Sequence, residues 1–163
     1  MREGTAALER GKVLVVYPEG TITRQPDLWP MTGKTGAARI ALSTGAPVIP
    51  VAQWGAHRIL PPYTTRPKLL PRKTIEMTAG RPVELDDLRD QPLTPQVLLA
   101  ATDRIMDEIT RLLEEIRGER APAERFDPRT AGVSLIGNPY ARDPARTTRL
   151  RGRTRKSRDR RPR

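Results

Sequence analysis

The stretch from Val13 to Thr21 constrains the fold of this chain more than any other segment. It begins with Val13-Leu-Val-Val-Tyr17, a run of apolar, mostly β-branched residues that is typical of a buried strand. Pro18 ends such a strand because it has no backbone N–H to donate, and Gly20 permits an unusual turn. The sequence therefore predicts a strand over 13–17 and a tight turn directly after it.

Polar side chains follow this predicted strand at its C-terminal end. They are Glu19, Thr21, Thr23 and Arg24. In open α/β sheets, ligands bind outside the carboxyl ends of the strands. A carboxylate, hydroxyls and a guanidinium suit an anionic ligand that also bears hydroxyls, such as a glycerol phosphate. The alternative is an ordinary polar turn, since Pro-Glu-Gly-Thr forms turns in many settings.

The remaining elements follow from apolar periodicity and from proline and glycine positions. The clearest is a helix over 95–117, with Thr94 as N-cap, Pro95 in the first turn, one apolar stripe and Gly118 at the end. Pro50 favours an edge position or a bulge for its strand. Strands that alternate with helices indicate an α/β fold. The other expected elements are helices over 3–10 and 36–44, strands over 48–52 and 74–79, and loops over 22–33 and 55–73.

Charge is concentrated at the C-terminus. The chain has a net charge of +11, and residues 142–163 hold 11 Lys or Arg and two Asp, so +9 of that charge lies there and +2 in the rest. This tail is predicted to be disordered. It is either a solvated tail or a segment that binds anionic lipid headgroups. Nucleic-acid binding is disfavoured because the tail lacks interleaved aromatic residues.

Composition excludes several other classes of site. The chain has no cysteine, which excludes disulfides and thiolate metal sites, and no cofactor or metal is expected. No apolar run reaches the roughly 20 residues that span a bilayer, so any membrane association is expected to be peripheral. The expected location is the cytoplasm, at the inner face of the cell membrane.

Three blocks, in order and in register, carry a resemblance to one family. They are Tyr17-Pro-Glu-Gly-Thr21, Met31-Thr-Gly-Lys-Thr-Gly-Ala-Ala-Arg39 and Ala46-Pro-Val-Ile-Pro-Val51. They resemble the Phe-Pro-Glu-Gly-Thr, Phe-Lys-x-Gly-Ala and Val-Pro-Val-Val-Pro-Val blocks of the 1-acylglycerol-3-phosphate (glycerophospholipid) acyltransferases. The resemblance covers roughly 5–115.

This resemblance implies an α/β fold in which a partial glycerolipid acyltransferase-like domain has a mixed sheet flanked by helices. The expected organisation is the C-terminal portion of that domain over 1–118, an irregular extension over 119–141 and the basic tail over 142–163. The implied activity, in phospholipid biosynthesis, is transfer of a fatty acyl group from acyl-CoA or an acyl-carrier protein to 1-acylglycerol-3-phosphate or a similar acceptor. The alternative is a non-catalytic basic module that binds anionic membrane or nucleic acid.

The resemblance also assigns substrate-binding residues. Glu19, Gly20 and Thr21 match the block that lies beside the glycerol phosphate of the acceptor. The family usually has an arginine directly after the threonine, where this chain has Ile22, and Arg24 is the expected substitute. Lys34 is a second candidate cation for the phosphate; its alternative role is that of a solvated lysine before a helix.

The catalytic base of the family is missing from this sequence. In the family it is the histidine of a His-x4-Asp motif that precedes the Pro-Glu-Gly-Thr block. The single histidine here, His57, follows the block and has Pro62 where the aspartate would fall, so a loop or partly packed histidine is expected. No catalytic residue is assigned, and the isolated chain is expected to be inactive. A mis-assigned start, a truncated gene and a split domain remain open.

Two further expectations concern apolar surface. Trp29-Pro-Met31, Trp54 and the segment 59–63 are expected to pack against the protein, with contact to a membrane or an acyl chain as the alternative. A domain without its early strands exposes a sheet edge, so poor solubility of the isolated chain is expected.

Overall fold

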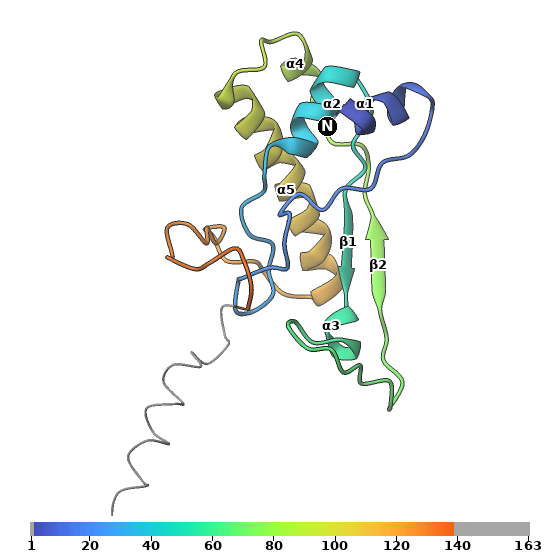
Figure 1. The fold of residues 1–163 in the computed structure, drawn as a ribbon, viewed down its shortest axis with the longest axis vertical. Helices are drawn as coiled ribbons and strands as arrows, with labels where there is room; N and C mark the ends of the chain where they lie inside the picture. Colours follow the sequence, from blue (N-terminus) through green and yellow to red (C-terminus); the bar gives the residue numbers. More distant parts are fainter. Residues whose placement is uncertain (1, 139–163) are drawn as a thin grey trace, which may run out of the picture.

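The structure is a computed structural model that describes residues 2–138 (Figure 1). A long helix, α5, runs through it, with a two-stranded sheet along one side and three short helices near its N-terminal end (Figure 1). The elements are α1 (Arg2–Glu9), α2 (Gly36–Thr44), β1 (Val51–Trp54), α3 (Ala56–Ile59), β2 (Glu76–Ala79), α4 (Asp86–Arg89) and α5 (Pro95–Arg117).

Helix α5 has the bounds that the sequence predicts. The Thr94 hydroxyl accepts a hydrogen bond from the Val97 backbone N–H at 3.3 Å, which caps the first turn. At the other end, Gly118 takes a left-handed conformation with φ 64°, and its N–H bonds to the Glu114 carbonyl. Both end signals are local, which explains why the sequence was sufficient to place them.

The apolar stripe of α5 faces two clusters of buried side chains. Near its N-terminal end, Leu98, Ala101 and Ile105 pack against residues of α2 and of the segment around α4. Near its C-terminal end, Leu112 and Leu113 pack against Ala52 of β1 and against Trp29. The helix therefore connects the loop that precedes α2 with the sheet.

The sheet consists of β1 and β2, which pair antiparallel with Val51 opposite Ala79 and Trp54 opposite Glu76. The two strands lie within a few residues of the predicted 48–52 and 74–79. Pairing continues beyond the strand bounds, because the Gly80 N–H donates to the Pro50 carbonyl at 2.9 Å. Pro50 itself is buried just ahead of β1, on an edge strand as expected.

The predicted strand over 13–17 is wrong. This segment has no strand assignment, and Val13, Val15 and Tyr17 are 91%, 76% and 80% exposed. A strand needs a neighbouring ladder, and among the described residues 13–17 has none. The sheet of the described part is therefore a two-stranded antiparallel sheet and not the mixed sheet that we expected.

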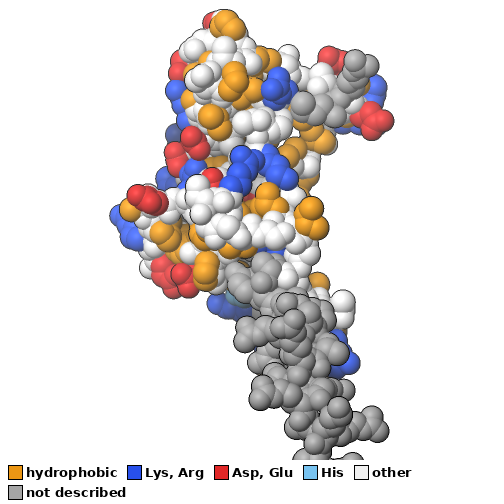
Figure 2. All heavy atoms as spheres, turned by 60° about the vertical axis from the view of Figure 1, so that its left-hand side comes forward, with side chains coloured by type: hydrophobic (Ala, Val, Ile, Leu, Met, Phe, Trp, Pro, Cys, Tyr) orange, Lys and Arg blue, Asp and Glu red, His pale blue; other side chains and the backbone are white. Residues whose placement is uncertain are grey.

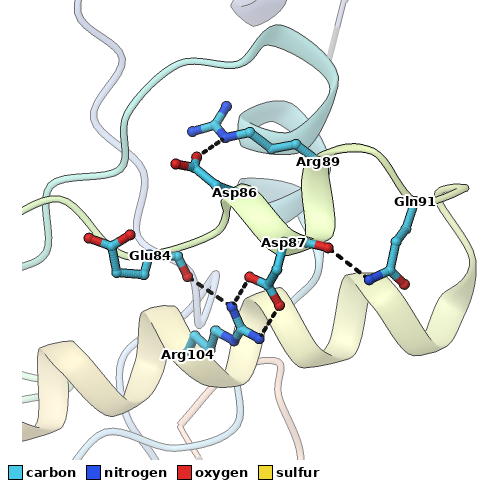
Figure 3. A network of polar contacts seen from close by, with 6 residues as sticks. All are labelled: Glu84, Asp86, Asp87, Arg89, Gln91 and Arg104. Atoms are coloured by element: carbon cyan, nitrogen blue, oxygen red, sulfur yellow. Dashed lines mark hydrogen bonds and ion pairs between the residues drawn. The ribbon is translucent and has the colours of Figure 1, made fainter.

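The segment that contains α4 was not predicted as a helix. It is held to α5 by Arg104, whose guanidinium donates to both oxygens of Asp87 at 2.5 and 2.7 Å and to the Glu84 carbonyl at 3.0 Å (Figure 3). The ion pair with Arg104 lowers the pKa of Asp87. A four-residue helix offers too little periodicity for detection from sequence, and its position depends on this tertiary contact.

Charged side chains of both signs are interspersed on the side of the molecule shown in Figure 2. Within residues 2–138, no helix combines the length and the apolar character that crossing a bilayer requires. The predicted basic tail, 142–163, lies outside the described residues, and so do the last residues of the predicted extension.

Candidate acceptor-binding site

The turn after residue 17 is built around Gly20 and lies against Lys34. The Gly20 N–H donates to the Tyr17 carbonyl at 3.0 Å, and Gly20 has φ +67°, a conformation that favours glycine. The Lys34 N–H donates to the Pro18 carbonyl at 2.8 Å. A Cβ atom on Gly20 would lie 2.9 Å from the Lys34 Nζ, so the lysine side chain crosses directly over the glycine. The structure thus brings together two of the predicted site residues that are 14 positions apart.

Glu19 belongs to this turn and is partly buried. Its Oε2 accepts a hydrogen bond from the Met31 backbone N–H at 3.2 Å. Burial raises the pKa of Glu19 from 4.5 to about 7, against the opposing effects of the Met31 N–H, the Thr23 hydroxyl and the charge of Arg125. The carboxyl group is therefore divided between its protonated and ionised forms near neutral pH.

The loop over 22–33 is fixed by its own polar groups and by α5. The Thr23 hydroxyl donates to the Trp29 carbonyl at 2.8 Å, and the Trp29 N–H donates to the Gln25 side chain at 3.0 Å. At the end of the loop, a Cβ atom on Gly33 would lie 2.9 Å from Thr102 of α5, so the backbone contacts the helix closely. These contacts hold the loop that supports Glu19.

The other predicted substrate-binding residues range from exposed to fully buried. Thr21 is partly buried and Lys34 is exposed, next to Gly20. Arg24 is 2% exposed, and its guanidinium donates to the Tyr63 hydroxyl and, at 2.8 Å, to the Leu135 carbonyl. Its guanidinium thus joins three segments of the protein, 22–33, 59–63 and the segment around 135.

The segment after α5 contributes to the site in a way that sequence reasoning missed. Arg125, whose charge acts on Glu19, forms ion pairs with Asp103 at 3.2 Å and Asp107 at 2.5 Å on α5. The Phe126 carbonyl next to it accepts a hydrogen bond from Thr32 at 3.0 Å. More than 100 residues separate Arg125 from Glu19, and no motif links them, so sequence patterns could not associate the two residues.

An open hollow of about 470 Å³ lies between this segment and the loop over 22–33. Trp29 and Pro30 line one side and Arg125, Phe126 and Asp127 line the other. The lining contains charges of both signs.

His57 lies on α3, and its ring packs against Trp54 with 4.3 Å between ring centroids. Burial lowers the pKa of His57, and the charges of Arg58 and Arg117 lower it further. The ring is therefore partly packed, which is one of the two environments expected for His57. Arg117 lies between Trp29 and Trp54, 3.9 and 4.2 Å from their ring centroids, and this stack ties the loop to the sheet.

The apolar segment Trp29-Pro-Met31, which we expected to pack against the protein, is mostly buried. Trp29 and Met31 are 5% and 1% exposed, so packing, the default expectation, is confirmed for these two residues. Leu60, in the segment 59–63, is 50% exposed.

Comparisons with known proteins support the resemblance predicted from the sequence. Residues 1–54 match the family model described as Acyltransferase. The structure is similar to the crystal structure of the 1-acyl-sn-glycerophosphate (LPA) acyltransferase PlsC from Thermotoga maritima, with a TM-score of 0.53 and 25% identity. That match covers 74% of this chain and 45% of the other, so this chain spans less than half of the length of that enzyme. No curated protein sequence matches the present chain significantly.

All five predicted substrate-binding residues fall within the matched 1–54. The predicted resemblance to the acyltransferases is therefore confirmed by a sequence comparison and by a structural one. The roles of the five residues remain predictions.

Proposed function

We propose that the chain forms the acceptor side of an acyltransferase active site that acts on a lysophospholipid. The observation that carries the proposal is the contact between Gly20 and Lys34, within a segment that matches the acyltransferase family. The contact puts an exposed ammonium group above a turn with accessible backbone. A phosphate on a glycerol acceptor is the ligand that this combination of groups suits.

In this proposal Lys34 binds the acceptor phosphate and Gly20 lets its ammonium group approach the turn. Thr21 supplies a hydroxyl for the glycerol. Glu19 belongs to the turn, and its pKa of about 7 permits the protonated form, which can donate a hydrogen bond where an ionised carboxylate would repel a phosphate. Arg24, whose guanidinium lies within the protein, positions the loop that supports Glu19.

The reaction would form an ester bond between the acceptor hydroxyl and the acyl carbonyl and break the thioester of acyl-CoA or an acyl-carrier protein. The hydroxyl proton must pass to a base, and the thiol leaves with a proton. His57 packs against Trp54 and its pKa is lowered, which disfavours proton uptake. We propose that the base comes from polypeptide outside the sequence 1–163, and that this polypeptide completes the site.

An acyl-transfer assay tests the proposal. Purified chain, acyl-CoA and lysophosphatidic acid should give no ester product, while the same preparation binds the acceptor headgroup. A clear yield of phosphatidic acid would refute the absence of a base in this chain. The variant His57→Ala then decides whether His57 is that base. Failure to bind any glycerol phosphate would refute the acceptor-site assignment itself.

A further inference from the structure

Within the described residues, the connection between β1 and β2 forms one end of the structure, opposite the end where α1, α2 and α4 lie (Figure 1). We call residues 58–73 of this connection the basic loop. It contains five basic residues and no acidic one, and from Leu28 to Ile75 the chain has no Asp or Glu. The basic residues are Arg58, Arg66, Lys68, Arg72 and Lys73.

These charges are not neutralised within the described part of the chain. No ion pair found among residues 2–138 includes any basic residue of the basic loop, whereas Arg104, Arg111 and Arg125 on or next to α5 all have acidic partners. The loop therefore presents an uncompensated positive surface, unlike the mixed charges of Figure 2. Its charge is complementary to an anionic partner.

The basic loop also exposes apolar side chains between its charges. Leu69 and Leu70 are 67% and 84% exposed, and Arg66, Lys68 and Arg72 around them are exposed as well. The Lys68 N–H donates to the Ile59 carbonyl at 2.7 Å, which holds the two halves of the loop side by side. Leu60, 50% exposed, thus lies in the half that runs next to the leucine pair.

The base of the loop is held in place. Gly55 lies so close to β2 that a Cβ atom there would be 2.3 Å from the Thr74 carbonyl oxygen, and the Tyr63 hydroxyl accepts a hydrogen bond from Arg24. Four prolines between 61 and 71 restrict the backbone further. Little conformational freedom would be lost when the loop docks on a surface.

We propose that the basic loop docks the protein on an anionic phospholipid surface, with Leu69 and Leu70 inserted among the acyl chains and the surrounding Lys and Arg on the headgroups. Long basic side chains reach headgroups while apolar neighbours sit deeper. Nucleic acid suits the loop less well. The one aromatic residue of the basic loop is Tyr63, and both its hydroxyl and its ring contact Arg24. Exposed leucines cannot stack on nucleic-acid bases as aromatic rings do.

This inference does not depend on the proposed acyl transfer, and its test uses no substrate. The sequence contains no cysteine, so Leu70→Cys introduces a single site for the environment-sensitive dye NBD in the full chain. Leu99→Cys, at a residue of α5 that is 54% exposed and far from the basic loop in sequence, is the matched control for the dye. The vesicles contain phosphatidylcholine and phosphatidylglycerol in equal parts, or phosphatidylcholine alone.

The dye at position 70 should shift to shorter wavelength with the anionic vesicles and be quenched by brominated lipid, whereas the dye at position 99 should not. Combined Arg66→Gln, Lys68→Gln, Arg72→Gln and Lys73→Gln should weaken the binding reported at position 70 by roughly fivefold for each charge removed. The control variant replaces with Gln four exposed basic residues outside the basic loop, Arg10, Lys12, Arg81 and Arg129. It should have a much smaller effect.

Three results would overturn the inference. The dye at position 70 could remain in water while the chain sediments with vesicles, which would assign binding to another segment. The two fourfold variants could lose binding equally, which would indicate attraction without a docking surface. An equal blue shift with duplex DNA would assign the loop to nucleic acid.

Discussion

The pKa of Glu19 makes the stability of this protein depend on pH in a direction opposite to that of most carboxylates. Burial raises this pKa from 4.5 to about 7 in the folded chain. Below pH 4.5 the group is protonated in both states and its burial is tolerated. As the pH rises from 4.5 through 7, the unfolded chain releases the proton first, so the free energy of unfolding falls. At about 1.4 kcal/mol per pKa unit, the loss is roughly 3 kcal/mol.

Glu19→Gln removes the titration and keeps an oxygen that can accept the Met31 N–H. The variant should match the wild-type chain near pH 4.5 and exceed it by roughly 3 kcal/mol at pH 8. The assay is urea denaturation followed by circular dichroism between these pH values. With ordinary denaturant slopes, the difference corresponds to a midpoint shift of roughly 1–3 M urea. Burial also lowers the pKa of His57, but this residue is present in both proteins and its contribution cancels in the difference.

Glu84→Gln is the matched control. Glu84 is exposed, and the hydrogen bond that it accepts from Arg104 is to its backbone carbonyl and not to its side chain. This variant should retain the pH dependence of the wild-type chain. A Glu19→Gln variant that is less stable than wild type at pH 8 would mean that the ionised carboxylate stabilises the fold. A stability difference that does not change with pH would mean that folding does not raise the pKa of Glu19.

Four further substitutions test the packing. Gly55→Ala should lower the free energy of unfolding in urea by about 3 kcal/mol or more, because the new Cβ atom would overlap the Thr74 carbonyl. Gly36→Ala, with open space around the glycine, should raise the free energy of unfolding by roughly 0.5–1 kcal/mol. Equal effects of the two variants would contradict the close contact between Gly55 and the Thr74 backbone. Leu112→Ala should lose about 2–5 kcal/mol because the side chain is 2% exposed; a loss below 1 kcal/mol would place α5 elsewhere. Val15→Lys should leave the free energy of unfolding within about 0.5 kcal/mol and reduce light scattering of the concentrated chain; a large loss of stability would restore the buried strand at 13–17.

The sequence predicted best those elements whose signals are local. Thr94, Pro95 and Gly118 mark the ends of α5, and Gly45 marks the end of α2 with φ 70°. The resemblance to the acyltransferases is likewise local, since it depends on three short blocks.

The prediction of a strand over 13–17 was wrong because the composition of a segment shows that it can form a buried strand, but not that a neighbouring strand is present to pair with it. Val13, Val15 and Tyr17 have strand propensity, yet the described chain offers them no ladder. Non-local contacts were equally invisible. Arg125 near Glu19, the Arg104–Asp87 ion pair that holds α4, and the Arg24–Tyr63 contact all join segments far apart in sequence.

In the proposed site, Lys34 and the turn at Gly20 bind the phosphate of a glycerol acceptor. Isothermal titration of glycerol 3-phosphate into the full chain tests it most directly, because this soluble headgroup avoids lipid aggregates. Lys34→Gln should weaken binding by roughly tenfold or more, as expected for the loss of a charge-assisted hydrogen bond, while Lys12→Gln, at another exposed lysine, should leave it nearly unchanged. Equal affinities for the two variants would show that Lys34 does not bind the phosphate.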